Sequence, residues 1–238
     1  MSLIGGTTAF IPIGISCQST RQLALNCEAI SSLLGEPLEY RSSFFNWVMV
    51  SADDIVRVLE RLTDRAITRP SIRVPSAYWR ANTLAGYRVW FWHEKPSHET
   101  SREMVGDLAN KYEHLRQNFL DLCARPNRFF VLCNTQNNIS SQDPYLDEGM
   151  SLIFDDHLIA EIRSALARLF PTGTNHLLVV GRPDRLVSSM REQVHVPPDD
   201  ATEWQGHDAA WSAIMASYLK AIPSLCPGRP GRLSSGAA

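Results

Sequence analysis

The sequence lacks the features that mark several classes of protein. No apolar run is long enough to cross a membrane, and the opening MSLIGGTTAF has neither the basic nor the long apolar segment of a signal peptide. We therefore expect a cytoplasmic protein with no membrane partner. Lys and Arg number 23 and Asp and Glu 25, so the net charge of -2 gives no reason to expect nucleic acid as a partner. The chain also has no G-x-G-x-x-G or P-loop motif.

The cysteines do not form a recognisable framework. They are odd in number and include no C-x-x-C pair, which argues against both a set of disulfides and a zinc site. The stretch FDDH at 154–157 combines acidic residues with a histidine, but within one turn this pattern is more typical of a helix cap. We therefore expect a reducing compartment, no metal and no cofactor. The five cysteines are Cys17, Cys27, Cys123, Cys133 and Cys226.

Strand-like and helix-like segments alternate along the chain. Apolar runs occur at 9–15, 87–93, 128–134 and 176–181, and amphipathic runs at 19–34, 55–62, 104–122, 158–169 and 211–219. This alternation predicts an α/β fold, a three-layer sandwich with a mostly parallel central sheet flanked by helices. We expect a single domain over 1–225 and a disordered tail over 226–238, which is rich in Pro, Gly and Ser.

The ends of the four apolar runs carry polar residues. In a parallel α/β sheet ligands bind outside the carboxyl ends of the strands, so these residues are predicted to share one edge. Polar residues at strand ends also occur in any α/β protein, where they simply meet solvent. The four groups are Ser16–Cys17, His93–Glu94, Asn134–Thr135 and 182–184.

Two of these residues have side chains suited to nucleophilic catalysis. Cys17 lies between a predicted strand and a predicted helix, where backbone N–H groups and the helix dipole favour a thiolate. His93 ends an aromatic run and would offer a ring nitrogen as a base. The alternatives are a small buried cysteine and a core histidine bonded to a backbone carbonyl.

Five short motifs follow one another in the sequence: IGISCQSTRQL, SSFFNWVMVS, WFWHE, KYEHLRQNF and WQGHDAAW. In order and approximate spacing they resemble a bacterial family of unknown function described as papain-like cysteine peptidases. The resemblance covers about Ile11 to Ile222, nearly the whole chain. It implies that Cys17 is the nucleophile and His93 its base. Papain itself has a helical half and a β-barrel half, so we take the resemblance as a guide to the chemistry and not to the fold.

The third catalytic residue is left open by these patterns. The aspartate of the family's P-F-D-W motif is Asn46 here, and an amide can orient an imidazole as the asparagine of papain-like triads does. Asn134 and Asp184, at the same predicted edge, are the rival candidates. Backbone N–H groups of Cys17 and Gln18 are expected to hold the oxyanion.

Aromatic residues suggest where a substrate would bind. Trp47 belongs to a group of tryptophans near the Asn46 to His93 region that could line a groove for a sugar or an apolar side chain, although core packing is the alternative. Trp204 could cover the predicted edge, and Asp208 could bind substrate or cap the last helix.

The lead hypothesis is therefore a thiol-dependent hydrolase, cysteine peptidase-like, or an acyltransferase acting on a peptide or other small acyl compound. The alternatives are a non-hydrolytic protein that handles a sugar or nucleotide sugar, and an interaction module without turnover. The sequence does not indicate an oligomeric state.

Overall fold

A mixed sheet of six strands forms the centre of the computed structural model, which describes residues 1–75, 81–94, 102–141, 149–187, 194–195 and 204–222. The tail predicted over 226–238 lies outside these ranges. Strand order is β12-β10-β8-β2-β1-β3, with parallel pairing from β12 to β2 and antiparallel pairing for β1 and β3. The parallel pairing that we predicted is thus found in part of a mixed sheet. The strands are β1 (Ser2–Ile4), β2 (Thr8–Pro12), β3 (Glu39–Arg41), β8 (Asn127–Cys133), β10 (Thr174–Val180) and β12 (Val194–His195).

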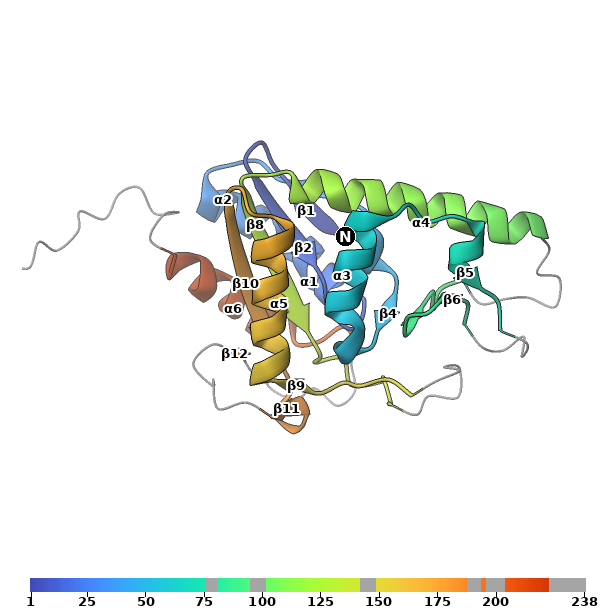
Figure 1. The fold of residues 1–238 in the computed structure, drawn as a ribbon. Helices are drawn as coiled ribbons and strands as arrows, with labels where there is room; N and C mark the ends of the chain where they lie inside the picture. Colours follow the sequence, from blue (N-terminus) through green and yellow to red (C-terminus); the bar gives the residue numbers. More distant parts are fainter. Residues whose placement is uncertain (76–80, 95–101, 142–148, 188–193, 196–203, 223–238) are drawn as a thin grey trace, which may run out of the picture.

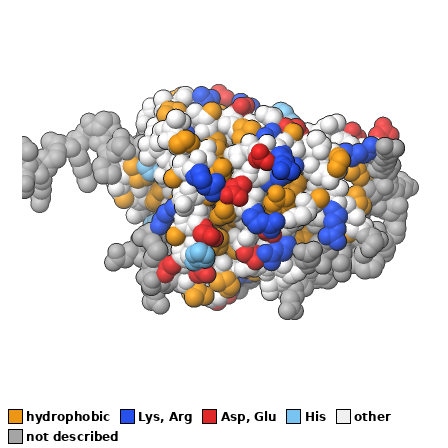
Figure 2. Space-filling model, in the orientation of Figure 1, with side chains coloured by type: hydrophobic (Ala, Val, Ile, Leu, Met, Phe, Trp, Pro, Cys, Tyr) orange, Lys and Arg blue, Asp and Glu red, His pale blue; other side chains and the backbone are white. Residues whose placement is uncertain are grey.

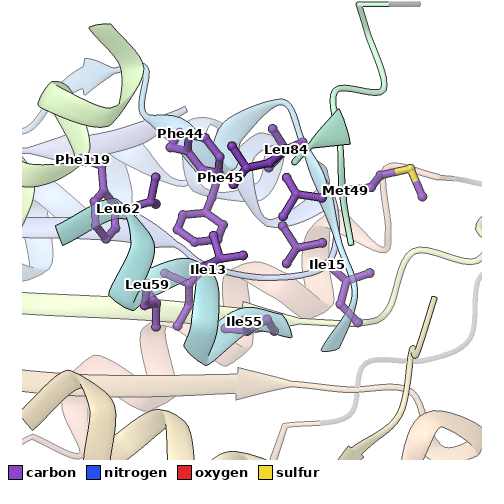
Figure 3. Close-up of a cluster of buried hydrophobic side chains, with 14 of the residues drawn as sticks. Ile13, Ile15, Phe44, Phe45, Met49, Ile55, Leu59, Leu62, Leu84 and Phe119 are labelled. Carbon is purple, nitrogen blue, oxygen red and sulfur yellow. The ribbon is translucent and has the colours of Figure 1, made fainter. Parts of the chain in front are cut away.

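Helices pack on both faces of this sheet because its central strands are apolar on both sides. In β8, Phe130 and Leu132 belong to one hydrophobic cluster and Phe129 and Val131 to the other, as the alternation of a strand requires. The first cluster includes α3 (Ile55–Asp64), α4 (Arg102–Cys123) and α5 (Asp156–Leu169), and the second includes α1 (Gln18–Leu25), α2 (Cys27–Leu34) and α6 (Asp208–Lys220). Figure 3 shows part of the first cluster, in which Ile13 and Ile15 lie near Ile55 of α3.

The helical periodicity of the sequence is largely reproduced. Helix α4 buries five residues of the predicted stripe (Leu108, Tyr112, Leu115, Phe119 and Leu122), while Met104 is 45% exposed. The helix predicted over 19–34 is instead two helices that meet at Asn26, whose side-chain amide donates to the carbonyl of Gln22 at 2.8 Å. The FDDH stretch caps a helix as expected, because Asp155 accepts a hydrogen bond from the Leu158 N–H at 2.7 Å.

The aromatic run 87–93 does not join the central sheet. It forms β7 (Val89–Trp90) in a separate antiparallel sheet with β4 (Met49–Val50), β5 (Ile72–Arg73) and β6 (Thr83–Leu84), in the order β4-β7-β6-β5. Its composition predicts a strand correctly but carries no information on which distant strand it pairs with. The expectation that His93 ends a strand of the central sheet is therefore wrong. A hydrogen bond from the Val50 N–H to the Ile15 carbonyl, at 3.1 Å, connects the small sheet to the segment after β2.

Charges on the face formed by α3 and α5 are mixed in sign. Figure 2 shows acidic and basic side chains interspersed there, and Arg168 of α5 pairs with Glu60 of α3 at 2.7 Å. This face therefore presents no large patch of one sign. None of the helices that the structure describes is both long and apolar enough to span a bilayer.

Candidate functional site

A cavity of about 210 Å³ lies between the carboxyl ends of β2 and β8 and the small antiparallel sheet. The segments after β2 and after β8 contribute to it as the edge rule predicts, since these neighbouring strands run parallel. The small sheet and the residues beside its strands contribute Trp47 to Met49, Trp92 and His93, and the segment before α6 contributes Trp204. The lining residues are Ser16, Cys17, Trp47, Val48, Met49, Trp92, His93, Gln136, Asn138, Ile139 and Trp204.

Cys17 occupies the turn between β2 and α1, directly before the first helical residue. The backbone after β2 stays paired with β8, because the Ile13 and Ile15 N–H groups donate to the Val131 and Cys133 carbonyls at 3.0 and 3.2 Å. Gly14 permits this approach: a Cβ on it would lie 2.6 Å from the backbone nitrogen of Cys133. The glycine thus fixes where the chain leaves the sheet and where the thiol is placed.

The environment of the thiol is less polar than the sequence indicated. Burial raises the pKa of Cys17, and the opposing effect of its own backbone N–H is smaller. Its hydrogen bond is to the side-chain oxygen of Gln136, at 3.9 Å from sulfur to oxygen. The sequence predicted a thiolate stabilised by the helix start, whereas the structure favours the neutral thiol at neutral pH. A base is therefore needed for the sulfur to act as a nucleophile.

His93 lies in the turn after β7 and lines the same cavity as Cys17. The turn is held at both ends by Asn82, whose carbonyl accepts from the Phe91 N–H at 2.8 Å and whose amide donates to the Glu94 carbonyl at 2.8 Å. The imidazole meets the Trp47 ring edge-on, with centroids 5.3 Å apart. The thiol donates to Gln136, and the imidazole lines the same cavity as the thiol.

Asn46 is fully buried and does not line the cavity. It closes the 3₁₀ turn η1 (Phe44–Asn46), where its side-chain oxygen accepts from the Ser43 N–H. Its amide nitrogen donates to the Thr20 hydroxyl at 3.1 Å. The two ends of the amide thus join η1 to α1, and the orienting role that the resemblance implied for Asn46 stays a prediction.

Gln18 connects three parts of the site. Its side-chain oxygen accepts from the Thr135 hydroxyl and from the Cys133 thiol, the latter at 3.5 Å, and its nitrogen donates to the Trp204 carbonyl at 2.9 Å. The side chain is 1% exposed, so these bonds are made away from water. Gln18 therefore holds the segments after β8 and before α6 against the turn that carries Cys17.

Trp204 lines the cavity, and the segment that carries it is attached to α1. Gln22 donates to the Gln205 carbonyl at 2.7 Å and to the Asp208 carboxylate at 2.8 Å. Gly206 has φ of 82°, a conformation that glycine adopts readily, and a Cβ there would lie 2.9 Å from the Gln18 amide. Asp208 is outside the cavity lining and pairs with Arg21 at 3.2 Å.

The cap of α6 is also different from the one proposed. The nitrogen Nδ1 of His207 accepts from the Ala210 N–H at 3.2 Å, so His207 is the N-cap and Asp208 the first helical residue. The helix start thus uses Asp208 as a negative charge in the first turn and as an anchor to α1.

The two rival candidates for a third catalytic residue lie elsewhere. Asn134 is buried; its amide donates to the Leu152 and Arg185 carbonyls at 2.9 and 3.1 Å, and its oxygen accepts from the Arg182 N–H. Asp184 is exposed in η4 (Pro183–Arg185) and pairs with Arg182 at 2.9 Å. Neither side chain lines the cavity.

Several residues of the cavity were missed by the sequence reasoning, above all Gln136, which bonds to the thiol. Gln136 directly follows Thr135. Only the first two polar residues after the predicted strand, Asn134 and Thr135, were assigned to the edge of the sheet. The segment is held by the buried Arg185, whose guanidinium donates to the carbonyls of Gln136 and Ile139 at 2.7 and 2.9 Å. Trp92, which also lines the cavity, belongs with Trp47 to the tryptophans near the Asn46 to His93 region.

Within the described parts of the chain, no three His, Cys, Asp or Glu side chains are placed so that they could hold a metal ion. No family model matches the chain, and the searches of curated proteins and of solved structures give no match either.

Proposed function

We propose that the protein is a thiol-dependent hydrolase or acyltransferase in which Cys17 is the nucleophile and His93 its base. The observation that carries this proposal is that the two side chains, far apart in the sequence, line one cavity. The thiol is partly exposed and the imidazole exposed, so both are accessible to a substrate. This is the chemistry implied by the resemblance to papain-like cysteine peptidases, and that family remains our proposal for the chain.

The raised pKa of Cys17 determines the form of the mechanism. The resting thiol keeps its proton, and His93 accepts that proton as the sulfur–carbon bond to the substrate carbonyl forms. The backbone N–H groups of Cys17 and Gln18, at the start of α1, are proposed to hold the oxyanion. His93 then returns the proton to the leaving group, and water or an acceptor cleaves the thioester.

The group that orients His93 is taken to be Trp47 rather than Asn46. Edge-on packing against the Trp47 ring restrains the imidazole, whereas both ends of the Asn46 amide are bonded elsewhere. We also propose that the architecture is the three-layer sandwich expected from the sequence. The separate helix sets that pack on the two faces of the central sheet support this.

A second candidate function is a non-hydrolytic protein that binds a sugar or nucleotide sugar. Trp47, Trp92 and Trp204 all line the cavity, and indole rings stack readily on sugar rings. In that case Cys17 would be incidental, and saturating sugar would raise the melting temperature of a Cys17→Ala protein as much as that of the unmodified protein.

Labelling with iodoacetamide followed by peptide mapping tests the lead proposal. We expect modification at Cys17 and no modification at Cys27, Cys123 or Cys133, which are all buried. Acylation by a p-nitrophenyl ester should then occur at Cys17, and Cys17→Ala should abolish it. Cys27→Ala, which removes a buried thiol outside the cavity, is the matched control and should retain it. Ester cleavage that is as fast in Cys17→Ala as in the unmodified protein would overturn the proposal.

A further inference from the structure

One residue of the cavity lining has a buried hydroxyl without a hydrogen-bond partner in the described protein. Ser16 is 2% exposed and lines the cavity, and its hydroxyl has no hydrogen-bond partner among the residues that the structure describes. A buried hydroxyl without a partner costs free energy that a bound acceptor would recover. Ser16 directly precedes Cys17 in the sequence and lines the same cavity.

The greater part of the cavity wall is apolar, and Ser16, Cys17, His93, Gln136 and Asn138 supply its polar groups. Three indole rings and the side chains of Val48, Met49 and Ile139 contribute to this wall, and the described lining contains no Asp, Glu, Lys or Arg. Trp47 and Trp204 are each 38% exposed, so a ligand can still cover part of their rings. Covering apolar surface favours an apolar ligand, whereas a charged group would lose its hydration without gaining an ion pair with an Asp, Glu, Lys or Arg side chain of the described lining.

The volume indicates the size of the group that the cavity itself holds. A dry cavity of about 150 Å³ lined by aliphatic and aromatic side chains is known to hold benzene. The cavity here measures about 210 Å³ and therefore holds a benzyl group or a short alkyl chain of similar bulk.

We propose that this cavity is an acyl-binding pocket for an uncharged apolar acyl group of benzyl size, whose carbonyl oxygen accepts a hydrogen bond from the Ser16 hydroxyl. The inference rests on the proposed function, because it takes Cys17 as the atom that attacks this carbonyl. It adds the class of acyl group that the site selects. A charged dicarboxylic acyl group or a free sugar is not a ligand of this pocket.

The first experiment measures binding without requiring turnover. Phenylacetamide and hexanamide are tested for their ability to protect Cys17 from iodoacetamide, with succinamate and glucose as charged and sugar comparisons. We expect the two neutral amides to slow alkylation in a saturable way and the comparisons to leave it unchanged. Protection by glucose or succinamate without protection by phenylacetamide would overturn the proposal.

Three variants locate the binding. Ser16→Ala should weaken protection by phenylacetamide by about 2- to 12-fold, the range that one neutral hydrogen bond supplies. Ile139→Trp fills the cavity and should abolish protection of Cys17 by phenylacetamide. Any protection by acetamide should be unchanged, because acetamide needs little space. Leu25→Ala is the control, because it changes a side chain that is 53% exposed and outside the cavity lining. Phenylacetamide should protect Cys17 in this variant as well as it does in the unmodified protein. Equal protection in Ser16→Ala and the unmodified protein would refute the role of the hydroxyl.

A second measurement separates failure of this inference from failure of the proposed function. Acylation rates are compared for p-nitrophenyl acetate, phenylacetate and monosuccinate. Protection by phenylacetamide without acylation by any ester would leave the pocket in place and refute the function. Acylation at Cys17 at similar rates with all three esters would support the function and refute the pocket.

Discussion

Replacing Gly14 by alanine should destabilise the protein and displace the nucleophile. The new Cβ would lie 2.6 Å from the Cys133 nitrogen and 2.9 Å from its carbonyl oxygen, and both are backbone atoms of a central strand. To relieve this overlap the segment must move away from β8. The hydrogen bonds from the Ile13 and Ile15 N–H groups to β8, at 3.0 and 3.2 Å, would then be weakened or lost.

The size of the effect follows from these two bonds. Each contributes about 1 kcal/mol net, and incomplete relief of the overlap adds to the loss, so we expect about 2 to 3 kcal/mol. For a chain of this length that corresponds to a fall in melting temperature of roughly 5 to 10 °C. Thermal and urea unfolding followed by circular dichroism measure it. The same movement shifts Cys17, so its alkylation rate should change as well.

Gly106→Ala is the matched control, because it is the same substitution with no steric consequence. A Cβ on Gly106 meets nothing within 4 Å, and the residue lies inside α4. Alanine there should stabilise the protein by about 0.5 to 1 kcal/mol through its higher helix propensity. Opposite signs for the two variants are the expected result. A Gly14→Ala protein that melts at or above the temperature of the unmodified protein would refute the argument about close approach to β8.

Three further predictions concern the site. Gln18→Glu replaces the donor to the Trp204 carbonyl by a buried acceptor, so urea unfolding should show a loss of about 2 to 3 kcal/mol; unchanged stability would contradict this bond. Asn46→Ala removes the cap of η1 and the bond to Thr20, so it should lower the free energy of unfolding by about 1 to 3 kcal/mol. A variant that is fully stable but inactive would instead indicate that Asn46 orients the imidazole. Because burial raises the pKa of Cys17, alkylation should be slow at neutral pH and rise steadily with alkaline pH; a rate that is already constant from mildly acidic pH would reveal a preformed thiolate.

The raised pKa of Cys17 also has a consequence for stability. The unfolded chain loses the thiol proton at a lower pH than the folded protein does, so the folded state binds more protons between the two pKa values. This contribution to stability is fully present below the ordinary thiol pKa and is lost as the pH rises through the raised value. Comparison of the unmodified protein with Cys17→Ala over the alkaline range measures it.

Features set by local sequence were predictable. The apolar run at 128–134 became a buried strand, the stripe along 104–122 became α4, and the acidic start at 155 became a helix cap. The turn carrying Cys17 was also located correctly between a strand and a helix, because an apolar run ends there and a polar run begins.

Features set by long-range pairing could not be predicted from the sequence. Nothing local in the run 87–93 shows that Trp90 pairs with Met49 in a second sheet, so the route by which His93 reaches the cavity could not be predicted. The residues that line the cavity with Cys17, among them Trp47, His93 and Gln136, come from segments distant in the sequence. The hydrogen-bond partners of Asn46 and Asn134 likewise depend on tertiary contacts. In the sequence, a polar residue at a strand end has the same pattern whether it bonds to neighbouring loops or contacts a substrate.

The central claim is that His93 removes the proton of Cys17 across the cavity that both residues line. It is tested most directly by the rate at which p-nitrophenyl phenylacetate acylates Cys17 at neutral pH in the unmodified protein and in His93→Gln. We predict a fall of about 100-fold or more, the usual contribution of a general base, with the melting temperature unchanged because the side chain is exposed. Equal acylation rates in the two proteins would contradict the account.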